Sequence, residues 1–417
     1  MVSMKSTKSS RTKIRFASEL DLHDEANPGT SLAAVTDGEH ILLYYEDRRA
    51  RIREINLPSY YNEDVEVLKK EVAKDAIGPC AIAAYVVPED EAFANKPTVR
   101  VIYQKQKKDA CLSQKVRVLY DEPWADLELH GAAGSTPLPR ETSSGACALH
   151  EALPSLGVQG EHEMIFLTAY GLPGAAEYRG SSHTDAKFHR KPVPTFEAPR
   201  FTCFKRGSTG NRRWMPAARQ PPVTSAWNPR TSLACRALPN DGGEDACVEV
   251  YSQDIAGNIC MLRRATEWQA QQTIIKAAEV KPQGSPLAVA PDPVDPRRAH
   301  VIFVDMAGFI SDYFGGSKTH IAKYHSGGLA AITYSKGRII VFFGYTDCSI
   351  PFDKRCTGIN SYVYERGAWK FGKVVLRAVE GRQSAETVPP TPTESVHGGP
   401  EDVAATLRDL GISETAD

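Results

Sequence analysis

Three short apolar runs separated by polar turns recur along the chain, and this pattern decides the fold. The first copy reads Ser31-Leu32-Ala33-Ala34-Val35, then Ile41-Leu42-Leu43-Tyr44-Tyr45, then Ile52-Arg53-Glu54-Ile55. Such runs, rich in β-branched and aromatic residues and bounded by Gly, Asp and Asn, are typical of β-strands joined by tight turns. Each copy therefore predicts a group of neighbouring strands.

The pattern returns at intervals of about 50 residues, with longer intervals around a weaker third copy. The first strands of the later copies are Cys80-Ala81-Ile82-Ala83-Ala84-Tyr85, Leu153-Pro154-Ser155-Leu156, Ser232-Leu233-Ala234-Cys235, Leu287-Ala288-Val289-Ala290 and Gly328-Leu329-Ala330-Ala331-Ile332. Small residues in these strands suit the crowded inner strand of a propeller blade. Six copies predict an all-β fold, a six-bladed β-propeller with long inserted loops. A β-sandwich with similar strands is the alternative, whereas the lack of 3.6-residue periodicity excludes a helical enzyme.

The repeat also sets the domain boundaries. Residues 13–380 are expected to form the propeller, with insertions at about 121–150 and 171–230 that are rich in Pro, Gly, Arg and Ser. Residues 1–12 are predicted to be a disordered tail. Residues 381–417 are predicted to be a C-terminal tail with a short helix, because Val403, Leu407 and Leu410 have helical spacing.

Composition excludes several classes of function. The chain has 417 residues, with 50 basic and 51 acidic side chains and a formal net charge of -1. This balance gives no field for attracting nucleic acid or a membrane surface, and no apolar run approaches the roughly 18 residues of a membrane helix. The polar N-terminus lacks the apolar segment of a secretion signal, which predicts a cytoplasmic protein.

The nine cysteines are scattered without a Cys-x-x-Cys motif, which predicts reduced thiols and neither a disulfide framework nor a zinc site. His183 and His189 in the second insertion are interpreted as solvated loop residues. No metal and no cofactor are expected, since the sequence has no P-loop, dinucleotide fingerprint, metalloprotease motif or nucleophile elbow.

The repeat resembles that of the fungal fucose-specific lectins, which are six-bladed propellers with a sugar pocket between neighbouring blades. The resemblance covers about residues 31–378 and is carried by the Ser-Leu-Ala-Ala-Val phrase followed by an apolar strand rich in tyrosine. It implies that each pocket uses an Arg on the second strand, a Glu on the third and an aromatic platform. An Arg and a Glu hydrogen-bond neighbouring hydroxyls while a ring packs on the apolar sugar face.

Most of the residues implied by this resemblance are replaced. In the first, second, fourth, fifth and sixth copies the Arg position holds Leu42, Arg100, Glu249, Val301 and Ile340, and the Glu position holds Glu54, Gln114, Met261, Asp312 and Ser361. No copy keeps the Arg and the Glu together, so multivalent fucose binding is predicted to be lost. Trp124, Trp268 and Trp369 lie near the platform position, where packing between blades explains them as well as binding does.

Within this family the chain resembles in kind the cofactor-free hetero-Diels–Alderases of fungal tropolone-sesquiterpene biosynthesis. The resemblance rests on the lost sugar motif, the absent signal and the extra loops. It implies small apolar polyketide and terpenoid substrates: a tropolone-derived o-quinone methide joined to a humulene-type alkene. Such a reaction needs apolar partners held at near-attack distance, a hydrogen-bond donor and a water-poor pocket.

Candidate residues for this reaction carry donors or rings near the predicted blade tops. The candidate catalytic donors are Arg100, Tyr103 and His320, and the candidate substrate-binding residues are Trp227, Tyr251, Tyr324, Phe343 and Tyr345. Each also has a structural interpretation: blade packing for Tyr251 and Phe343, a surface ion pair for Arg100, and a satisfied polar group for His320. Two other functions stay open, a fucose-binding lectin with degenerate sites and a protein-interaction propeller.

Overall fold

The computed structural model divides into two compact units, Met1–Val379 and Glu380–Asp417. The structure describes residues 26–27, 29–57, 68–76, 80–90, 93–105, 111–119, 123–127, 146–152, 161–169, 200–207, 215–216, 232–238, 247–264, 267–282, 284–334, 337–346 and 357–376. Both predicted tails, the expected C-terminal helix, Trp227, His183 and His189 lie outside the described residues.

Six antiparallel sheets of four strands follow one another along the first unit, and each is made from one continuous segment. Blade 1 contains β1 (Ala33–Thr36), β2 (Ile41–Glu46), β3 (Ile52–Leu57) and β4 (Leu68–Ala73). Blade 2 contains β5 (Ile82–Asp90), β6 (Lys96–Lys105), β7 (Cys111–Val118) and β8 (Ala125–Leu127). Blade 3 contains β9 (Ala146–Ala152), β10 (Glu161–Ala169), β11 (Arg200–Gly207) and β12 (Met215–Pro216).

The C-terminal half repeats the arrangement. Blade 4 contains β13 (Ala234–Leu238), β14 (Cys247–Gln253), β15 (Ile259–Arg264) and β16 (Gln272–Ile275). Blade 5 contains β17 (Leu287–Pro291), β18 (Ala299–Val304), β19 (Phe309–Phe314) and β20 (Ser317–Lys323), and blade 6 contains β21 (Leu329–Tyr334), β22 (Arg338–Thr346), β23 (Thr357–Glu365) and β24 (Ala368–Leu376). A 3-10 helix, η4 (Ala277–Glu279), precedes β17, and no helix among the described residues is long and apolar enough to cross a membrane.

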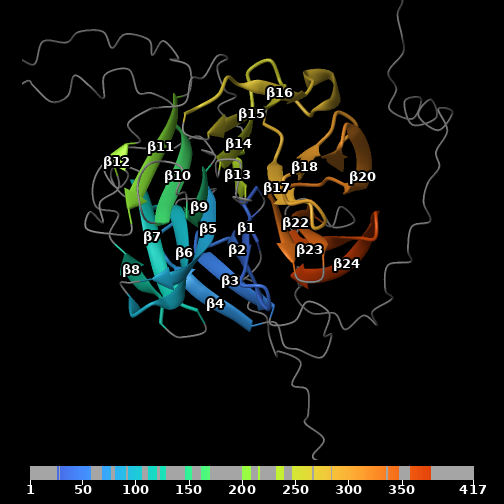
Figure 1. Cartoon of the computed structure of the whole chain (residues 1–417). Coiled ribbons are helices and arrows are strands. Elements are labelled where there is room, and N and C mark those ends of the chain that lie inside the picture. Colours follow the sequence, from blue (N-terminus) through green and yellow to red (C-terminus); the bar gives the residue numbers. More distant parts are fainter. Residues whose placement is uncertain are drawn as a thin grey trace, which may run out of the picture. The chain divides into compact units, whose positions relative to one another are not determined.

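The first strands of the six sheets form a closed ring. They contact one another in the order β1, β5, β9, β13, β17 and β21, and β21 returns to β1. Figure 1 shows β1, β5, β9, β13 and β17 gathered at the centre, with the later strands of each sheet further out. The predicted six-bladed propeller is therefore confirmed.

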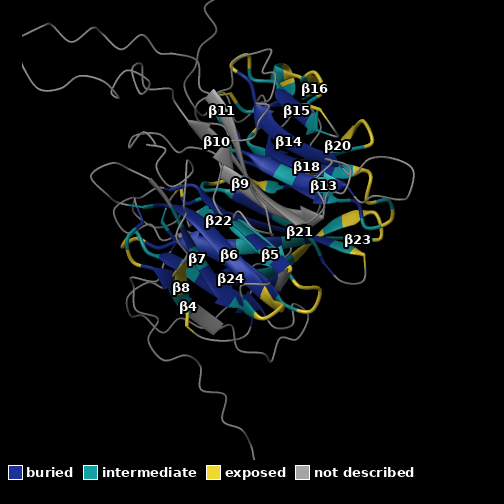
Figure 2. Cartoon of the chain, turned by 60° about the vertical axis from the view of Figure 1, so that its left-hand side comes forward, coloured by how far each residue is buried: buried dark blue, intermediate teal, exposed yellow. Residues whose placement is uncertain are grey.

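The blades are held together by apolar side chains on both faces of their second strands. The whole of β2 and β14 is buried, and Figure 2 shows β6 and β18 as mostly buried. A strand between two neighbouring blades has no solvent face, so its side chains alternate between two interfaces. Ile41, Leu43 and Tyr45 pack towards blade 6, whereas Leu42 and Tyr44 pack towards blade 2.

A repeated turn joins the second and third strands in three blades. Its first residue is an aspartate, whose backbone N–H donates to the carbonyl four residues later and whose Oδ1 accepts the N–H of that same residue. The fourth residue has a positive φ, which favours glycine. The three aspartates are Asp47, Asp254 and Asp305, and the positive-φ residues are Ala50, Gly257 and Gly308.

The ring closes without any exchange of strands between the first and last blades. The Gly328 N–H donates to the Thr30 carbonyl at 2.7 Å, and the Tyr334 hydroxyl donates to the Glu39 carbonyl at 2.6 Å. Between these bonds, one apolar cluster joins β2 and β3 to β21–β24. Packing and a few hydrogen bonds thus keep blade 6 on blade 1.

Blade 3 differs from the sequence prediction in its strand positions. Its inner strand is β9, which ends at Ala152, whereas the prediction placed that strand at residues 153–156, outside the described residues. Strands β8, β9, β11 and β12 lie wholly or partly in the stretches expected to be insertions. The third blade is thus spread along the sequence, and turn-rich composition concealed its strands.

Replacing Gly328 with alanine is expected to weaken ring closure. A Cβ there would lie 2.8 Å from the Leu32 nitrogen and 2.9 Å from the Ser31 Cα, which are backbone atoms that cannot move aside cheaply. We expect Gly328→Ala to lower the free energy of unfolding by about 2–3 kcal/mol in urea titrations. Gly38→Ala, in open space but at positive φ, serves as the control and is expected to cost only about 1 kcal/mol. Equal losses would contradict the closure role.

Candidate functional site

Two of the predicted catalytic donors lie on β6 and are engaged by carboxylates. Arg100 is buried and its Nη2 donates to Asp90 Oδ2, so its ion pair is internal instead of at the surface. The Tyr103 hydroxyl donates to Asp75 Oδ1 at 2.8 Å, and burial raises the pKa of this phenol. Arg100 thus joins β6 to the end of β5, and Tyr103 joins β6 to the segment between blades 1 and 2.

The third predicted donor, His320, lies on β20 in blade 5. Its Nε2 is 3.1 Å from Asp305 Oδ2, and its ring stacks on Phe309 with the centroids 4.9 Å apart. The side chain is about half exposed at 51%. His320 thus attaches the outer strand to the aspartate of the repeated turn, as the structural interpretation predicted.

The described aromatic candidates are scattered over blades 4 to 6. Tyr251 and Phe343 are buried between blades, where the Tyr251 hydroxyl donates to Glu249 Oε2 at 2.6 Å. Burial raises the pKa of Tyr324 to about 12, and its hydroxyl donates to the Gly327 carbonyl. The ring of Tyr345 lies where a Cβ of Gly358 would be. The structure does not bring these residues and the three predicted donors into one pocket.

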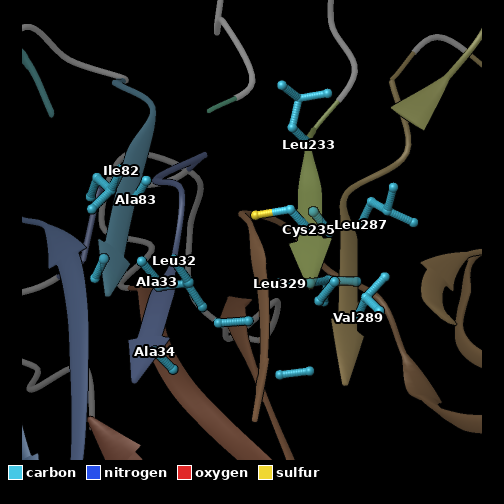
Figure 3. A pocket seen from close by; sticks show the side chains of 15 residues that line it. Leu32, Ala33, Ala34, Ile82, Ala83, Leu233, Cys235, Leu287, Val289 and Leu329 are labelled. Atoms are coloured by element: carbon cyan, nitrogen blue, oxygen red, sulfur yellow. The ribbon is translucent and has the colours of Figure 1, made fainter. Parts of the chain in front are cut away.

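A small cavity lies where the inner strands converge. Its volume is about 120 Å³, and Figure 3 shows the apolar side chains that surround it. Sites for small molecules usually enclose roughly 300–1,000 Å³. The lining residues are Leu32, Ala33, Ala34, Ile82, Ala83, Ala84, Leu233, Ala234, Cys235, Leu287, Ala288, Val289, Leu329, Ala330 and Ala331. The cavity has room for solvent or a very small apolar group.

Strand register shows which residues share an interface between blades. On β18, Ile302 lies opposite Asp312, and paired residues project to the same side of a sheet. His300, two residues before Ile302, faces that side too, whereas Val301 packs on the opposite face against blade 4. The same offset of two residues holds in other blades. Leu42 lies two residues before Tyr44, which is opposite Glu54. Ile340 lies two residues before Phe342, which is opposite Ser361.

This register corrects one sequence assignment. The residue of blade 5 at the Arg position is His300 and not Val301, because a shift of one residue along a strand moves the side chain to the other face. Blade 5 therefore keeps a ring nitrogen and a carboxylate together. No described blade has both an Arg and a Glu at these positions, but blade 5 has a histidine and an aspartate there.

In three other blades a residue other than glutamate stands at the Glu position, and its side chain contacts other groups of the protein. Gln114 donates to the Tyr85 hydroxyl at 2.8 Å. Met261 packs in the apolar cluster between blades 4 and 5. The Ser361 hydroxyl donates to the Lys373 carbonyl and accepts the N–H of the same residue. None of these three residues presents a carboxylate to the neighbouring blade.

Between blades 1 and 2 the carboxylate is retained but is already neutralised. Arg117 Nη2 donates to both oxygens of Glu54 at 2.9 and 2.7 Å, and the Tyr44 hydroxyl donates to Glu54 Oε2 at 2.9 Å. Trp124 covers this group, with the Arg117 Cζ 5.0 Å from the ring centroid. Glu54 is completely buried. Arg117 thus takes the place that a ligand hydroxyl would need.

Between blades 5 and 6 a different arrangement surrounds Asp312. Its Oδ2 lies 2.7 Å from His300 Nδ1 and accepts Trp369 Nε1 from blade 6 at 3.1 Å. Its buried Oδ1 has no hydrogen-bond partner among the described residues. His300 Nε2 lies 3.2 Å from Asp292 Oδ2. We call His300, Asp312 and Trp369, with Phe314 and Tyr364 around them, the 5/6 site.

Aromatic rings form the outer part of the 5/6 site. Phe314 is stacked on His300 with the centroids 4.0 Å apart, and Tyr364 lies 4.8 Å from His300 and 5.3 Å from Trp369. Phe314, Tyr364 and Trp369 are each partly exposed, whereas His300 and Asp312 are buried beneath them. The site therefore has partly exposed aromatic side chains above a buried polar floor.

The groups beneath the 5/6 site shift the pKa values of Asp292 and Tyr364. Burial alone would raise the pKa of Asp292, but the N–H groups of Asp295 and Val294 and the nearby ring of His300 lower it overall. Burial and the charges of Asp312 and Asp292 raise the pKa of Tyr364, which keeps its hydroxyl protonated and able to donate. The site thus combines carboxylate acceptors with ring N–H and phenol donors.

Comparisons with solved structures identify the architecture. The fold matches AofleA from Arthrobotrys oligospora with a TM-score of 0.58 and 14% sequence identity, over 86% of this chain and 89% of that chain. It also matches the fungal lectin of Aleuria aurantia, a six-bladed β-propeller that recognises fucose, with a TM-score of 0.55 and 13% identity, over 86% and 99% of the two chains. The chain has the propeller fold of a fungal fucose lectin.

The remaining comparisons are less specific. A protein of unknown function from Dyadobacter fermentans is similar with a TM-score of 0.51 and 8% identity, over 82% of this chain and 97% of that chain. No family model matches the sequence, and no curated protein sequence matches it. At these identities the likeness establishes the fold, so the function has to be argued from the site.

The buried pair between blades 1 and 2 gives a stability prediction. Arg117→Met leaves Glu54 buried without a countercharge, and we expect it to lower the free energy of unfolding by about 3–5 kcal/mol. The double variant Glu54→Gln, Arg117→Met removes both charges and is expected to lose less than the single variant. Urea unfolding of the wild type and these variants tests this, and a double variant that loses more than Arg117→Met would contradict it.

Proposed function

We propose that the protein binds carbohydrate at the 5/6 site. The observation that carries this proposal is Asp312, a buried carboxylate with one oxygen held by His300 and Trp369 and the other without a donor among the described residues. A buried acceptor without a partner costs free energy, and a ligand hydroxyl would satisfy it. The aromatic faces around Asp312 suit the apolar face of a sugar ring.

Each part of the 5/6 site has a role in this binding. Asp312 accepts a hydrogen bond from a ring hydroxyl, and His300 holds that carboxylate from beneath. Trp369 supplies both a ring face and an N–H that fixes the carboxylate, while Tyr364 offers a phenol donor. This division of roles supports recognition of a polyol with one apolar face and does not require a metal or a nucleophile.

Binding of this kind is expected to involve few sites and low affinity. The Glu position between blades 1 and 2 is closed by Arg117, and those of blades 2, 4 and 6 hold an amide, a thioether and a hydroxyl. The Aleuria aurantia lectin recognises fucose. In this chain a histidine stands where the resemblance implies an arginine, so fucose is one probe among several monosaccharides.

The hetero-Diels–Alder reaction implied by the resemblance stays a prediction, as does the protein-interaction role. Arg100 and Tyr103 are held by carboxylates, and Trp227 and most of residues 171–230 lie outside the described residues. Incubation of the pure protein with a quinone methide precursor and a humulene alcohol tests the reaction. An adduct ratio identical to that in buffer would exclude it.

Two matched tryptophan substitutions test the carbohydrate site. Trp369→Phe keeps a ring but removes the N–H that holds Asp312, and we expect it to weaken sugar binding about threefold to tenfold. Trp124→Phe makes the same change at the closed interface between blades 1 and 2 and is expected to leave binding unchanged. Calorimetry with monosaccharides at about 10 mM detects a millimolar Kd.

A substitution of the carboxylate provides a second test. Asp312→Asn keeps the shape of the side chain but removes its charge, and we expect it to abolish measurable binding, with folding checked by thermal unfolding. Absence of any sugar signal for the wild type, or equal weakening by the two tryptophan variants, would overturn the proposal.

A further inference from the structure

One arginine at the edge of the 5/6 site, Arg298, is held by stacking on an aromatic ring and not by an ion pair with a carboxylate among the described residues. The Arg298 guanidinium lies over the Phe314 ring with its Cζ 4.1 Å from the centroid. A Cβ on Gly315 would lie only 2.5 Å from Arg298 Nη2, so the glycine leaves room for this stacking. Because Phe314 also stacks on His300, Arg298 caps the aromatic cluster that surrounds Asp312.

The backbone that carries Arg298 is fixed from blade 4. Arg236 donates from Nη1 to the carbonyls of Arg298 and Pro296 at 2.7 and 2.9 Å, and from Nη2 to that of Arg297 at 2.8 Å. Arg236 in turn pairs with Glu249 at 2.7 Å. This buried pair holds the segment between β17 and β18, so the backbone of Arg298 has a fixed position.

Arg298 also differs from most described arginines because no carboxylate among the described residues pairs with it. Arg298 is exposed and forms no ion pair with an acidic group among the described residues. By contrast, carboxylates engage Arg51, Arg53, Arg100, Arg117, Arg236 and Arg338. Stacking on Phe314 restricts the motion of the exposed guanidinium.

We infer that the 5/6 site prefers acidic sugars, such as hexuronic acids, and that Arg298 determines this preference. This inference rests on the proposed carbohydrate binding and names its ligand class. A sugar hydroxyl reaches Asp312 while the sugar carboxylate pairs with Arg298 at the edge of the ring cluster. Phe314 and His300 lie between the two groups, which separates the ligand's negative charge from the buried aspartate.

The expected size of the preference follows from the exposure of Arg298. An exposed ion pair contributes little when both partners are mobile, but a fixed guanidinium that binds a carboxylate in bidentate fashion contributes more. We therefore expect glucuronic and galacturonic acid to bind about threefold to tenfold more tightly than glucose and galactose. The difference is expected to shrink as salt rises from about 50 to 500 mM, because screening acts on the charged contact.

Substitution of Arg298 tests the assignment with the full chain. Arg298→Gln is expected to remove the preference, so that the two acids bind no more tightly to this variant than glucose and galactose do. Arg297→Gln makes the same charge change one residue away and serves as the matched control. Calorimetric titration of each protein with the two acid–neutral pairs gives the ratio of Kd values directly.

The outcomes separate this inference from the proposed function. Equal affinity of the wild type for acidic and neutral sugars, or equal effects of the two arginine variants, overturns the role of Arg298 and leaves sugar binding standing. Absence of binding to every sugar overturns both. A preference for acids that Arg298→Gln removes and Arg297→Gln retains supports the inference.

Discussion

The structure depends on the burial of both faces of the second strands between neighbouring blades, as the described strands β2 and β14 show. A residue on such a strand belongs to one interface or the other, and the choice alternates at every position. Apolar side chains satisfy this constraint at most positions, at roughly 1.5–3 kcal/mol for each large side chain removed from water. Polar residues at these positions have to find partners within the same interface, because water does not reach them.

The interfaces meet this requirement in different ways. Between blades 1 and 2 an arginine from the next blade neutralises Glu54, which makes the group structural. Between blades 4 and 5 the Glu249–Arg236 pair extends to three backbone carbonyls and orders a loop. Between blades 5 and 6, His300 and Trp369 satisfy only one oxygen of Asp312. Of the carboxylates Glu54, Glu249 and Asp312, Asp312 is the one with a buried oxygen that has no hydrogen-bond partner among the described residues.

The repeat allowed the fold to be predicted, because short apolar runs at a regular interval leave few alternatives to a propeller. Strand positions in blade 3 could not be predicted, since its turn-rich segments carry too weak a pattern. The Arg position of blade 5 was assigned one residue too late, at Val301, because the apolar run suggested that alignment. The pairing of Ile302 with Asp312 in the structure shows that His300 occupies this position. Arg298 was missed because it lies outside the repeated strands and matters through its stacking on Phe314.

The repeat also explains how a single interface can acquire a binding role. The described blades 1, 2, 4, 5 and 6 use the same positions on their second and third strands, so a polar residue can change at one interface while the other described interfaces maintain the packing. The 5/6 site combines residues of one repeat, His300 and Asp312, with Trp369 of the next, and its edge carries Arg298 from a connecting segment. The strands position His300 and Asp312, and the side chains of the segment between β17 and β18 determine the charge at the edge of the site. Specificity is therefore expected to vary in the connections while the ring stays constant.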